Sequence, residues 1–324
     1  MKTAIVGAGI NGLYLAWQLS KAGHEVTVFE KKEKIGKEAC SGLFSERILE
    51  FIPESKRLVE NEINSVLIHF PKKTLKICFS RKFFVMSHFQ LDNLVAGLAR
   101  NEGAKIILNQ AVNSLPEGFE RIIGCDGPLS TVRKKLNLAE LDYRLAIQGF
   151  VSKEDKSDSV ETWPIKSGFL WKIPRGKEVE YGIIAKPSLV KGVGDENKSS
   201  SSPFTVVRVF DEFLRKRNIQ VERMKSALVP QNFCIPANAK ITLCGDAAGL
   251  TKPWSGGGVI WGLVAAGILL KNFPDFLKYQ KEARSFFLPR IISSKICTVG
   301  AYFFGFRFPW IIPTKIKIES DFLI

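Results

Sequence analysis

The sequence has little histidine, little methionine and no paired cysteines, and each shortage excludes a kind of protein. Only three histidines and three methionines occur among the 324 residues. The six cysteines are scattered without a CxxC spacing, which argues against a zinc site or a disulfide framework and suits reduced thiols in the cytoplasm. Neither a metal-binding cluster nor a Ser-His-Asp set appears, so we expect no metal centre. With only three histidines, we also expect no histidine-centred acid–base chemistry.

Long apolar runs and acidic residues are also scarce. No window of about 18 apolar residues occurs, so we expect no membrane-spanning helix, and the first strand begins so early that we expect no signal peptide. Basic residues outnumber acidic ones by 47 to 32, giving a net charge of +15. The lysines are spread along the chain rather than gathered in an RNA-binding motif, so we expect no nucleic-acid partner. A solvated surface, a membrane face and an anionic substrate all remain open.

The first thirty residues contain a nucleotide-binding pattern. A short strand, Lys2 to Val6, runs into a Gly-x-Gly-x-x-Gly turn, a helical pattern follows from Leu13 to Ala22, and a second strand ends in an acid. The first glycine permits a tight turn, the second lets a pyrophosphate approach the backbone, and the third lets helix and strand pack closely. The acid accepts ribose hydroxyls. We expect a dinucleotide site that includes Gly7, Ala8, Gly9, Gly12, Glu30 and Lys31.

The middle of the chain alternates in the manner of strands. Paired strands are expected at 66–70 and 75–79, a further strand at 83–87, and a helix from Leu91 to Asn101 that Gln90 or Asp92 opens. From Leu145 to Lys186 the pattern predicts a curved antiparallel sheet, a suitable wall for a substrate cavity.

Two further strand-to-glycine turns follow the first. One is Cys125-Asp126-Gly127, and the other begins at Gly245-Asp246 and ends in a Gly-Gly-Gly turn before an apolar helix. Such a turn offers free backbone amides to an anion or a polar ring.

The Cys40-Ser41-Gly42 turn either passes close to a cofactor or simply buries a thiol. The aromatic stretch 286–312 either packs on the core or contacts a membrane surface.

Taken together, these motifs stand in the order found in FAD-dependent oxidoreductases of the p-hydroxybenzoate hydroxylase type, which the chain resembles. The resemblance implies that FAD is the cofactor and that Asp246 binds its ribityl or phosphate-linked polar groups. It also implies that the Asp126-Gly127 turn lies near the cofactor and that the triple glycine faces the isoalloxazine. The cofactor residues implied in this way are Asp126, Gly127, Gly245, Asp246, Pro253, Gly256, Gly257 and Gly258.

Within that superfamily the chain looks most like the geranylgeranyl reductases. The stretch 37–43 resembles their Cys-Gly-Gly turn beside the flavin, and 168–176 resembles their aromatic-x-Trp-x-Phe-Pro-x-Gly stretch along a lipid cavity. Departures are Gly257 in place of a common glutamate, Ser41 in place of a glycine, and His88 in place of a frequent arginine. The resemblance implies Cys40, Ser41, Gly42 and Arg47 at the flavin, Cys40 being the candidate catalytic residue, and Phe169, Trp171 and Pro174 at the substrate.

The expected function is saturation of C=C bonds in polyprenyl (geranylgeranyl) chains of an isoprenoid diphosphate or prenyl-ether phospholipid, by hydride transfer from FAD. Residues 169–174 also resemble the Trp-x-Trp-x-Ile-Pro stretch of flavin-dependent halogenases. A halogenase, a monooxygenase and a non-catalytic FAD-binding protein at a membrane surface are therefore the alternatives. The electron donor is NAD(P)H or a ferredoxin-like protein. The protein is expected in the cytoplasm, or peripherally at the inner face of the membrane.

The expected fold class is α/β with α+β inserts, in which a Rossmann-like FAD-binding domain is interleaved with an antiparallel substrate domain. The FAD-binding domain is assigned to residues 1–65, 88–144 and 234–275, and the substrate domain to 66–87 and 145–233. A helical, aromatic-rich segment, 276–324, completes the chain.

Overall fold

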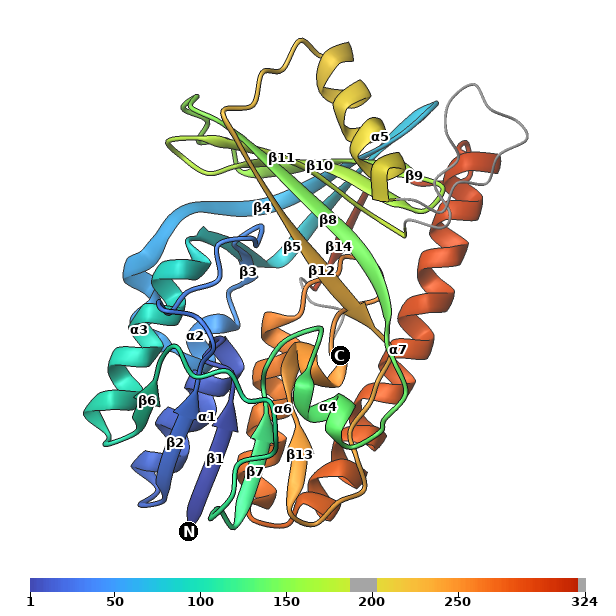
Figure 1. Ribbon diagram of the computed structural model, residues 1–324. Helices are drawn as coiled ribbons and strands as arrows, with labels where there is room; N and C mark the ends of the chain where they lie inside the picture. Colours follow the sequence, from blue (N-terminus) through green and yellow to red (C-terminus); the bar gives the residue numbers. More distant parts are fainter. Residues whose placement is uncertain (187–202, 320–324) are drawn as a thin grey trace.

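The computed structural model describes residues 1–186 and 203–319, which form two sheets one above the other (Figure 1). The lower sheet has five parallel strands in the order β13-β7-β1-β2-β6, and the upper sheet has nine strands. This arrangement confirms the predicted fold class of a Rossmann-like unit joined to a curved sheet. Residues 187–202 and 320–324, which the assigned substrate domain and C-terminal segment include, lie outside the described residues.

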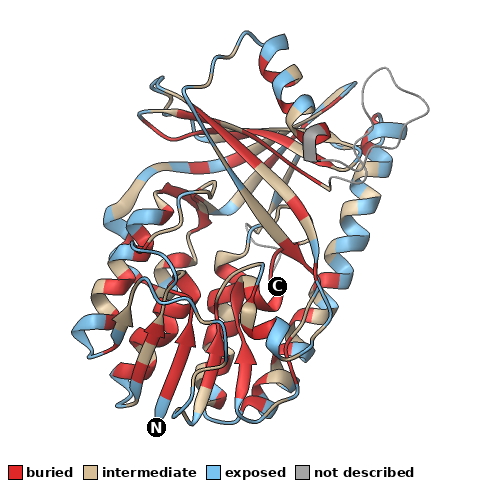
Figure 2. Ribbon diagram, in the orientation of Figure 1, coloured by how far each residue is buried: buried red, intermediate tan, exposed pale blue. Residues whose placement is uncertain are grey.

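The lower sheet is buried, and helices pack against it (Figure 2). Its strands are short and apolar, as expected for a parallel sheet that has no solvated face. They are β1 (Lys2–Val6), β2 (Glu25–Phe29), β6 (Lys105–Ile107), β7 (Arg121–Gly124) and β13 (Ile241–Leu243). The helices of this layer are α1 (Ile10–Lys21), α2 (Ile48–Phe51), α3 (His88–Asn101), α4 (Thr131–Lys135) and α6 (Val259–Asn272), together with the 3₁₀ turns η1 (Pro53–Leu58) and η3 (Gly245–Ala248).

The upper sheet has the order β12-β8-β11-β10-β9-β4-β5-β14, with β3 also paired to β5. Its strands are β3 (Leu43–Ser45), β4 (Val59–Phe70), β5 (Lys73–Met86), β8 (Asp142–Val151), β9 (Ser159–Ile165), β10 (Gly168–Pro174), β11 (Val179–Ala185), β12 (Arg223–Gln231) and β14 (Lys315–Ile318). Most pairs are antiparallel as predicted, but β4 pairs with β9 and β5 with β14 in parallel. The antiparallel sheet predicted from Leu145 to Lys186 is confirmed, since β8, β11, β10 and β9 pair antiparallel in that order.

The strands around the first hairpin are longer than the sequence pattern predicts. β4 begins at Val59, and β5 runs unbroken through both the stretch predicted at 75–79 and the one predicted at 83–87. Arg81 and Lys82, which lie between the two predicted stretches, are partly exposed and form ion pairs with Glu50 and Glu62. β3 and the start of β4 fall within 1–65, yet they lie in the upper sheet.

The two faces of the upper sheet have different partners. The outer face packs against α5 (Pro203–Lys216), where Phe210 and Phe213 meet Leu170 and Ile183. The inner face turns toward the lower layer and carries a second apolar cluster that includes Trp171. Residues alternate between these faces along each strand, so one strand supplies both a packing surface and a cavity wall.

One long helix, α7 (Phe276–Arg307), runs along one side of the molecule from the lower layer to the upper sheet (Figure 1). Its first half packs in the core of the lower layer through residues such as Tyr279 and Phe287. In its second half the Tyr302 hydroxyl donates to the Gly168 carbonyl of β10 at 2.8 Å. The segment predicted as helical from 276 also contains β14, because its Lys-Ile-Lys-Ile alternation pairs with the open edge of β5. In the described part of the chain, no helix is long and apolar enough to cross a membrane.

Candidate active site

A cavity of about 720 Å³ opens between the two sheets. Ligand pockets usually measure about 300–1,000 Å³, so this space can hold a large cofactor or a cofactor together with part of a substrate. The turns that follow β1, β2 and β7 line its lower side, and the inner face of the upper sheet lines its upper side. The carboxyl ends of parallel strands are the usual ligand-binding edge of such a sheet.

The three glycines of the first turn have the separate roles that their spacing predicts. Gly7 has φ +103°, and a Cβ there would lie 2.4 Å from the Cys125 carbonyl oxygen. A Cβ on Gly12 would lie 2.1 Å from the Gly7 carbonyl oxygen. Gly9, in contrast, has no described atom within 4 Å of its Cβ position, so it leaves the turn open toward the cavity. A bulky anionic group can therefore approach this backbone closely.

Two helices begin at this cavity, α1 after Gly9 and α6 after Gly258. Neither N-terminus has a side-chain cap or an acidic residue in its first turn among the residues that the structure describes. Free N–H groups and the positive end of the helix dipole therefore face the cavity, which favours an anion or a polar ring. The Glu30 carboxylate, held by the amides of Ala8 (2.7 Å) and Lys32 (3.0 Å), lies beside them.

Most residues predicted for the cofactor line this one cavity. They are Gly7, Ala8, Gly9, Glu30, Lys31, Cys40, Ser41, Asp126, Gly127, Asp246, Gly256, Gly257 and Gly258. The Asp126 carboxylate also caps α4, since it accepts from the Ser130 hydroxyl at 2.5 Å and the Thr131 amide at 2.6 Å. Asp246 forms an ion pair with Lys37, 3.2 Å from Oδ2 to Nζ.

The other predicted residues stand behind the cavity wall of the described structure. Gly12, Gly42 and Gly245 shape the turns. Pro253 accepts through its carbonyl from Arg144 at 3.1 Å, and Pro174 accepts from Asn61 at 3.0 Å. Arg47 forms an ion pair with Glu319 at 2.8 Å and is absent from the described lining of the cavity. Direct cofactor contacts by Arg47, Pro253 and Pro174 stay predictions.

The upper wall of the cavity is apolar. Phe169 and Trp171 line it as predicted. The sequence did not predict the other apolar residues of this wall, because the fold decides which face of a strand turns to the cavity. The missed apolar residues are Val66, Phe79, Phe83, Ala146, Val160, Ile173, Ile184 and Val229. For Phe79 and Phe83 a sequence signal existed, because residues four apart on one strand lie on the same face of the sheet.

A cluster of polar side chains lies where the two walls meet, and the sequence reading missed most of it. His88 and Asp92 both line the cavity beside Cys40 and Lys37. The helix α3 begins at His88, with Ser87 as its N-cap, rather than at Leu91 as predicted. His88 and Asp92 therefore lie one turn apart on one helix face, with Nε2 of the imidazole 3.3 Å from Oδ1 of the carboxylate.

The site fits a flavin dinucleotide, because an open glycine turn, two uncapped helix N-termini and an anchored glutamate line one cavity.

Comparisons with known proteins agree with a dinucleotide-binding fold. Residues 5–47 match the family described as NAD(P)-binding Rossmann-like domain. Digeranylgeranylglycerophospholipid reductase 1 of Methanosphaera stadtmanae is 24% identical over 320 residues, covering 86% of this chain and 77% of the relative.

Two solved structures share the fold. A geranylgeranyl bacteriochlorophyll reductase-like protein from Thermoplasma acidophilum superimposes with a TM-score of 0.79 at 18% identity, covering 92% of this chain and 86% of its own. A tryptophan 6-halogenase from Streptomyces toxytricini gives a TM-score of 0.73 at 14% identity, covering 93% and 78%. The chain has the fold of FAD-dependent reductases and halogenases. The predicted resemblance to the geranylgeranyl reductases and the predicted cofactor, FAD, are thereby confirmed.

The charges of the polar cluster in this flavoprotein are strongly coupled. Burial would lower the pKa of His88, but the Asp92 carboxylate and the Cys40 sulfur raise that pKa to about 10. Burial would raise the pKa of Cys40, but the charge and hydrogen bond of His88, with the charge of Lys37, bring that pKa below its ordinary value. The Asp246 carboxylate raises the pKa of Lys37. The cluster therefore places His88, Lys37 and the Cys40 thiol together at the cavity, and the expectation of no histidine-centred acid–base chemistry stays a prediction.

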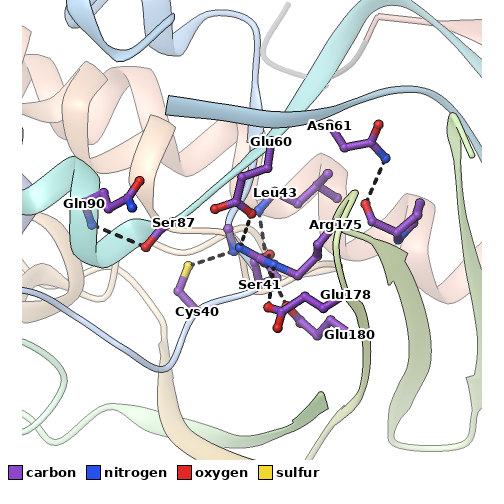
Figure 3. Close-up of polar contacts among 12 residues, drawn as sticks. Cys40, Ser41, Leu43, Glu60, Asn61, Ser87, Gln90, Arg175, Glu178 and Glu180 are labelled. Atoms are coloured by element: carbon purple, nitrogen blue, oxygen red, sulfur yellow. Dashed lines mark hydrogen bonds and ion pairs between the residues drawn. The ribbon is translucent and has the colours of Figure 1, made fainter. Parts of the chain in front are cut away.

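A buried arginine ties the Cys40 turn of the flavoprotein to the upper wall (Figure 3). Arg175 donates to the Ser41 carbonyl at 2.6 Å and to the Glu180 carboxylate at 3.0 Å. Glu180 also accepts from the Trp171 indole at 2.9 Å, so the turn and the wall share one network. Burial raises the pKa of Glu180 to about 7, although Arg175 lowers it. The network sets where Cys40 stands relative to Trp171.

Proposed function

We propose that this flavoprotein reduces C=C bonds in polyprenyl chains of an isoprenoid diphosphate or a prenyl-ether phospholipid. The observation that carries the proposal is the apolar upper wall, which shares a single cavity with the flavin-binding turns. An aliphatic chain has no polar group to satisfy, so such a wall binds it by burial alone. The name of the Methanosphaera relative supports a prenylated lipid as the substrate class.

The chain's own residues provide binding and orientation. The turn at Gly7 to Gly9 and the N-terminus of α1 would hold the pyrophosphate of FAD, and Glu30 would accept its ribose hydroxyls. Asp246 would bind the ribityl or phosphate-linked polar groups, and the triple glycine would lie near the ring. Bound FAD would supply hydride chemistry, with NAD(P)H or a ferredoxin-like protein as the electron donor. Phe169 and Trp171 align the alkene and keep water away from it.

An anaerobic experiment tests the proposal. We expect the dithionite-reduced holoenzyme to be reoxidised by geranylgeranyl diphosphate or an unsaturated prenyl-ether phospholipid, with a gain of two hydrogens per double bond in the lipid product. The saturated lipid is the matched control, since it binds the same wall and has no bond to reduce. A reduced flavin that ignores both lipids and consumes oxygen rapidly would instead favour a halogenase or a monooxygenase.

A second part of the proposal concerns how the protein reaches a lipid. Much of the second half of α7 is exposed (Figure 2). Its exposed large apolar residues recur at spacings of three and four residues, and two more follow the end of the helix. These residues are Ile292, Ile296, Val299, Phe303, Phe306, Trp310 and Ile311, of which Val299 and Trp310 are about 70% exposed. We call these seven residues the α7 stripe.

The charge around the α7 stripe favours an anionic bilayer as its partner. Between Ala283 and Ile318 the sequence has six basic residues and no acidic one. Arg307, Lys315 and Lys317 are exposed close to the aromatic end of the stripe. Apolar and aromatic side chains flanked by cations are the pattern of a helix that lies in a membrane interface.

Vesicle binding tests the α7 stripe. We expect Phe303→Ser combined with Trp310→Ser to weaken binding to phosphatidylglycerol vesicles by about tenfold or more, because each aromatic loses more than 1 kcal/mol of burial. Leu277→Ser is the matched control, since Leu277 is 42% exposed on the same helix but lies outside the stripe. Equal binding by all three proteins, or no preference of the wild type for anionic over neutral vesicles, would refute the membrane assignment.

A further inference from the structure

One buried arginine of the upper sheet has no acidic partner in the described structure. Arg144 lies on β8 and is only 5% exposed, and among the described residues it forms no ion pair. Its guanidinium donates to two neutral carbonyl oxygens, those of Pro253 at 3.1 Å and Trp254 at 3.4 Å. Arg175, which is about as deeply buried, pairs with three glutamates instead. Because a buried charge without a counter-ion is costly, Arg144 calls for a role other than stability.

Arg144 stands where the apolar wall meets the triple-glycine turn. Gln148, four positions on, lines the cavity, so Arg144 belongs to the same face of β8. The guanidinium carbon lies 6.0 Å from the centre of the Phe169 ring, which also lines the cavity. A Cβ at Gly256 would lie 2.7 Å from Cδ1 of Ile184, so the turn packs directly against this part of the wall. Arg144 itself is absent from the described lining, so it acts on a ligand through the turn and through the field of its charge.

The charge and the dipoles at this turn have the same sign. Burial lowers the pKa of Arg144 to about 10, which leaves the guanidinium charged at neutral pH. A carbonyl that accepts a hydrogen bond from a cation polarises the N–H of its own peptide group. The two N–H groups concerned belong to Trp254 and Ser255, which line the cavity. The positive end of α6, which follows Gly258 and has no cap or first-turn acid among the described residues, adds to them.

The other charged groups at the turn do not cancel this field. Oδ1 of Asp246 lies 2.8 Å from the Cβ position of Gly258, but Oδ2 is 3.2 Å from the Lys37 ammonium, so this acid is matched. Lys252 of the same turn is a further basic residue of the lining. Tyr302 faces the arginine from α7, and burial raises its pKa to about 12, so it is a neutral phenol. The turn therefore presents a positive potential to the cavity.

We propose that Arg144 is a positioning residue that stabilises negative charge on the flavin ring through the triple-glycine turn and so raises the reduction potential of the bound FAD. The proposal rests on the ring lying beside the triple glycine, which is part of the proposed function, and is independent of the lipid. Reduction adds two electrons and one proton to the neutral ring and leaves one negative charge on it. NAD(P)H or a ferredoxin-like protein is the source of the electrons. The unmatched charge of Arg144 therefore gains its counter-charge when the ring is reduced.

Redox titration of the FAD-loaded protein against a reference dye, with dithionite as the reductant, tests the proposal. Arg144→Gln keeps an N–H donor for the two carbonyls but removes the charge. We expect its preference for the reduced ring to fall about tenfold, which for a two-electron couple is a potential about 30 mV lower. Arg144→Lys keeps the charge and should stay within about threefold of the wild type. Arg217→Gln, which removes an exposed cation beside Trp163 on the outer face of the same sheet, should leave the potential unchanged.

Two further results distinguish an effect of the charge from a merely structural one. Arg144→Gln should bind oxidised FAD within about threefold of the wild type, because the oxidised ring is neutral. Equal loss of affinity for both redox forms, with an unchanged potential, would overturn the proposal.

The second result needs no variant. The reduced wild-type protein should keep the absorption spectrum of the anionic ring at a pH where free reduced FAD is protonated, because the turn stabilises the negative charge. A protonated ring at that pH would also overturn the role of Arg144. None of these measurements contains a lipid, so the proposed reduction of C=C bonds can fail while the role of Arg144 stands.

Discussion

Replacing Arg175 by alanine is expected to lower the free energy of unfolding by about 3–5 kcal/mol, because it leaves the buried Glu180 carboxylate without its ion-pair partner. The Glu180 carboxylate is fully buried and would lose its only close cation in the described structure. Glu60 and Glu178, 3.1 and 3.5 Å from the guanidinium, would lose their shared partner as well. Urea unfolding followed by circular dichroism measures the loss.

Arg223→Ala is the matched control for this prediction. Arg223 also forms an ion pair with Glu178, but it is about half exposed, and surface pairs contribute about 1 kcal/mol or less. The difference in free energy of unfolding between Arg175→Ala and Arg223→Ala should become smaller at low pH. Burial raises the pKa of Glu180 to about 7, so below that pH this carboxyl is neutral in the folded protein and needs no cationic partner. Equal destabilisation by Arg175→Ala and Arg223→Ala would contradict the buried network.

The substitution Gly12→Ala is expected to weaken FAD binding about 100-fold or more, equivalent to about 3 kcal/mol. Its methyl group would lie 2.1 Å from the Gly7 carbonyl oxygen and 3.2 Å from the Cys125 Cβ, and neither atom belongs to the far end of a flexible side chain. The start of α1 must therefore move away from the pyrophosphate site. Fluorescence of released flavin, titrated against the apoprotein, measures the dissociation constant.

Gly97→Ala provides the comparison. Gly97 lies inside α3 with no described atom within 4 Å of its Cβ position, so alanine should fit and stabilise the helix by up to about 1 kcal/mol. FAD affinity should stay at the wild-type value. Retained affinity in Gly12→Ala would show that the turn does not need this close approach.

The sequence predicts the flavin side of the site well because its signals are local. Each turn combines a strand, glycines and an acid within a few residues, so Glu30 or Asp246 can be placed without knowing the rest of the fold. The lining of the cavity by these residues follows from the parallel sheet, which brings the ends of β1, β2 and β7 together.

The polar cluster and the Arg175–Glu180 network bring together residues that are far apart in the sequence, and no local pattern reveals such contacts. Ser41 and Arg175 are 134 positions apart, and only the pairing of the upper sheet brings them into contact. His88 and Asp92 are close in sequence, but the predicted helix began at Leu91 and so hid their one-turn spacing. The Ser87 cap, which accepts from the Gln90 amide at 3.3 Å, was the missed signal.

The path of α7 has a mechanical consequence. One continuous helix is packed at its start into the core of the lower layer and fastened at its end to the upper sheet, where Gly305 lies against the ring of Phe70. A hinge between the layers would have to bend this helix or break one of its attachments. We therefore expect a ligand to enter by side-chain and loop motion rather than by an opening of the two layers.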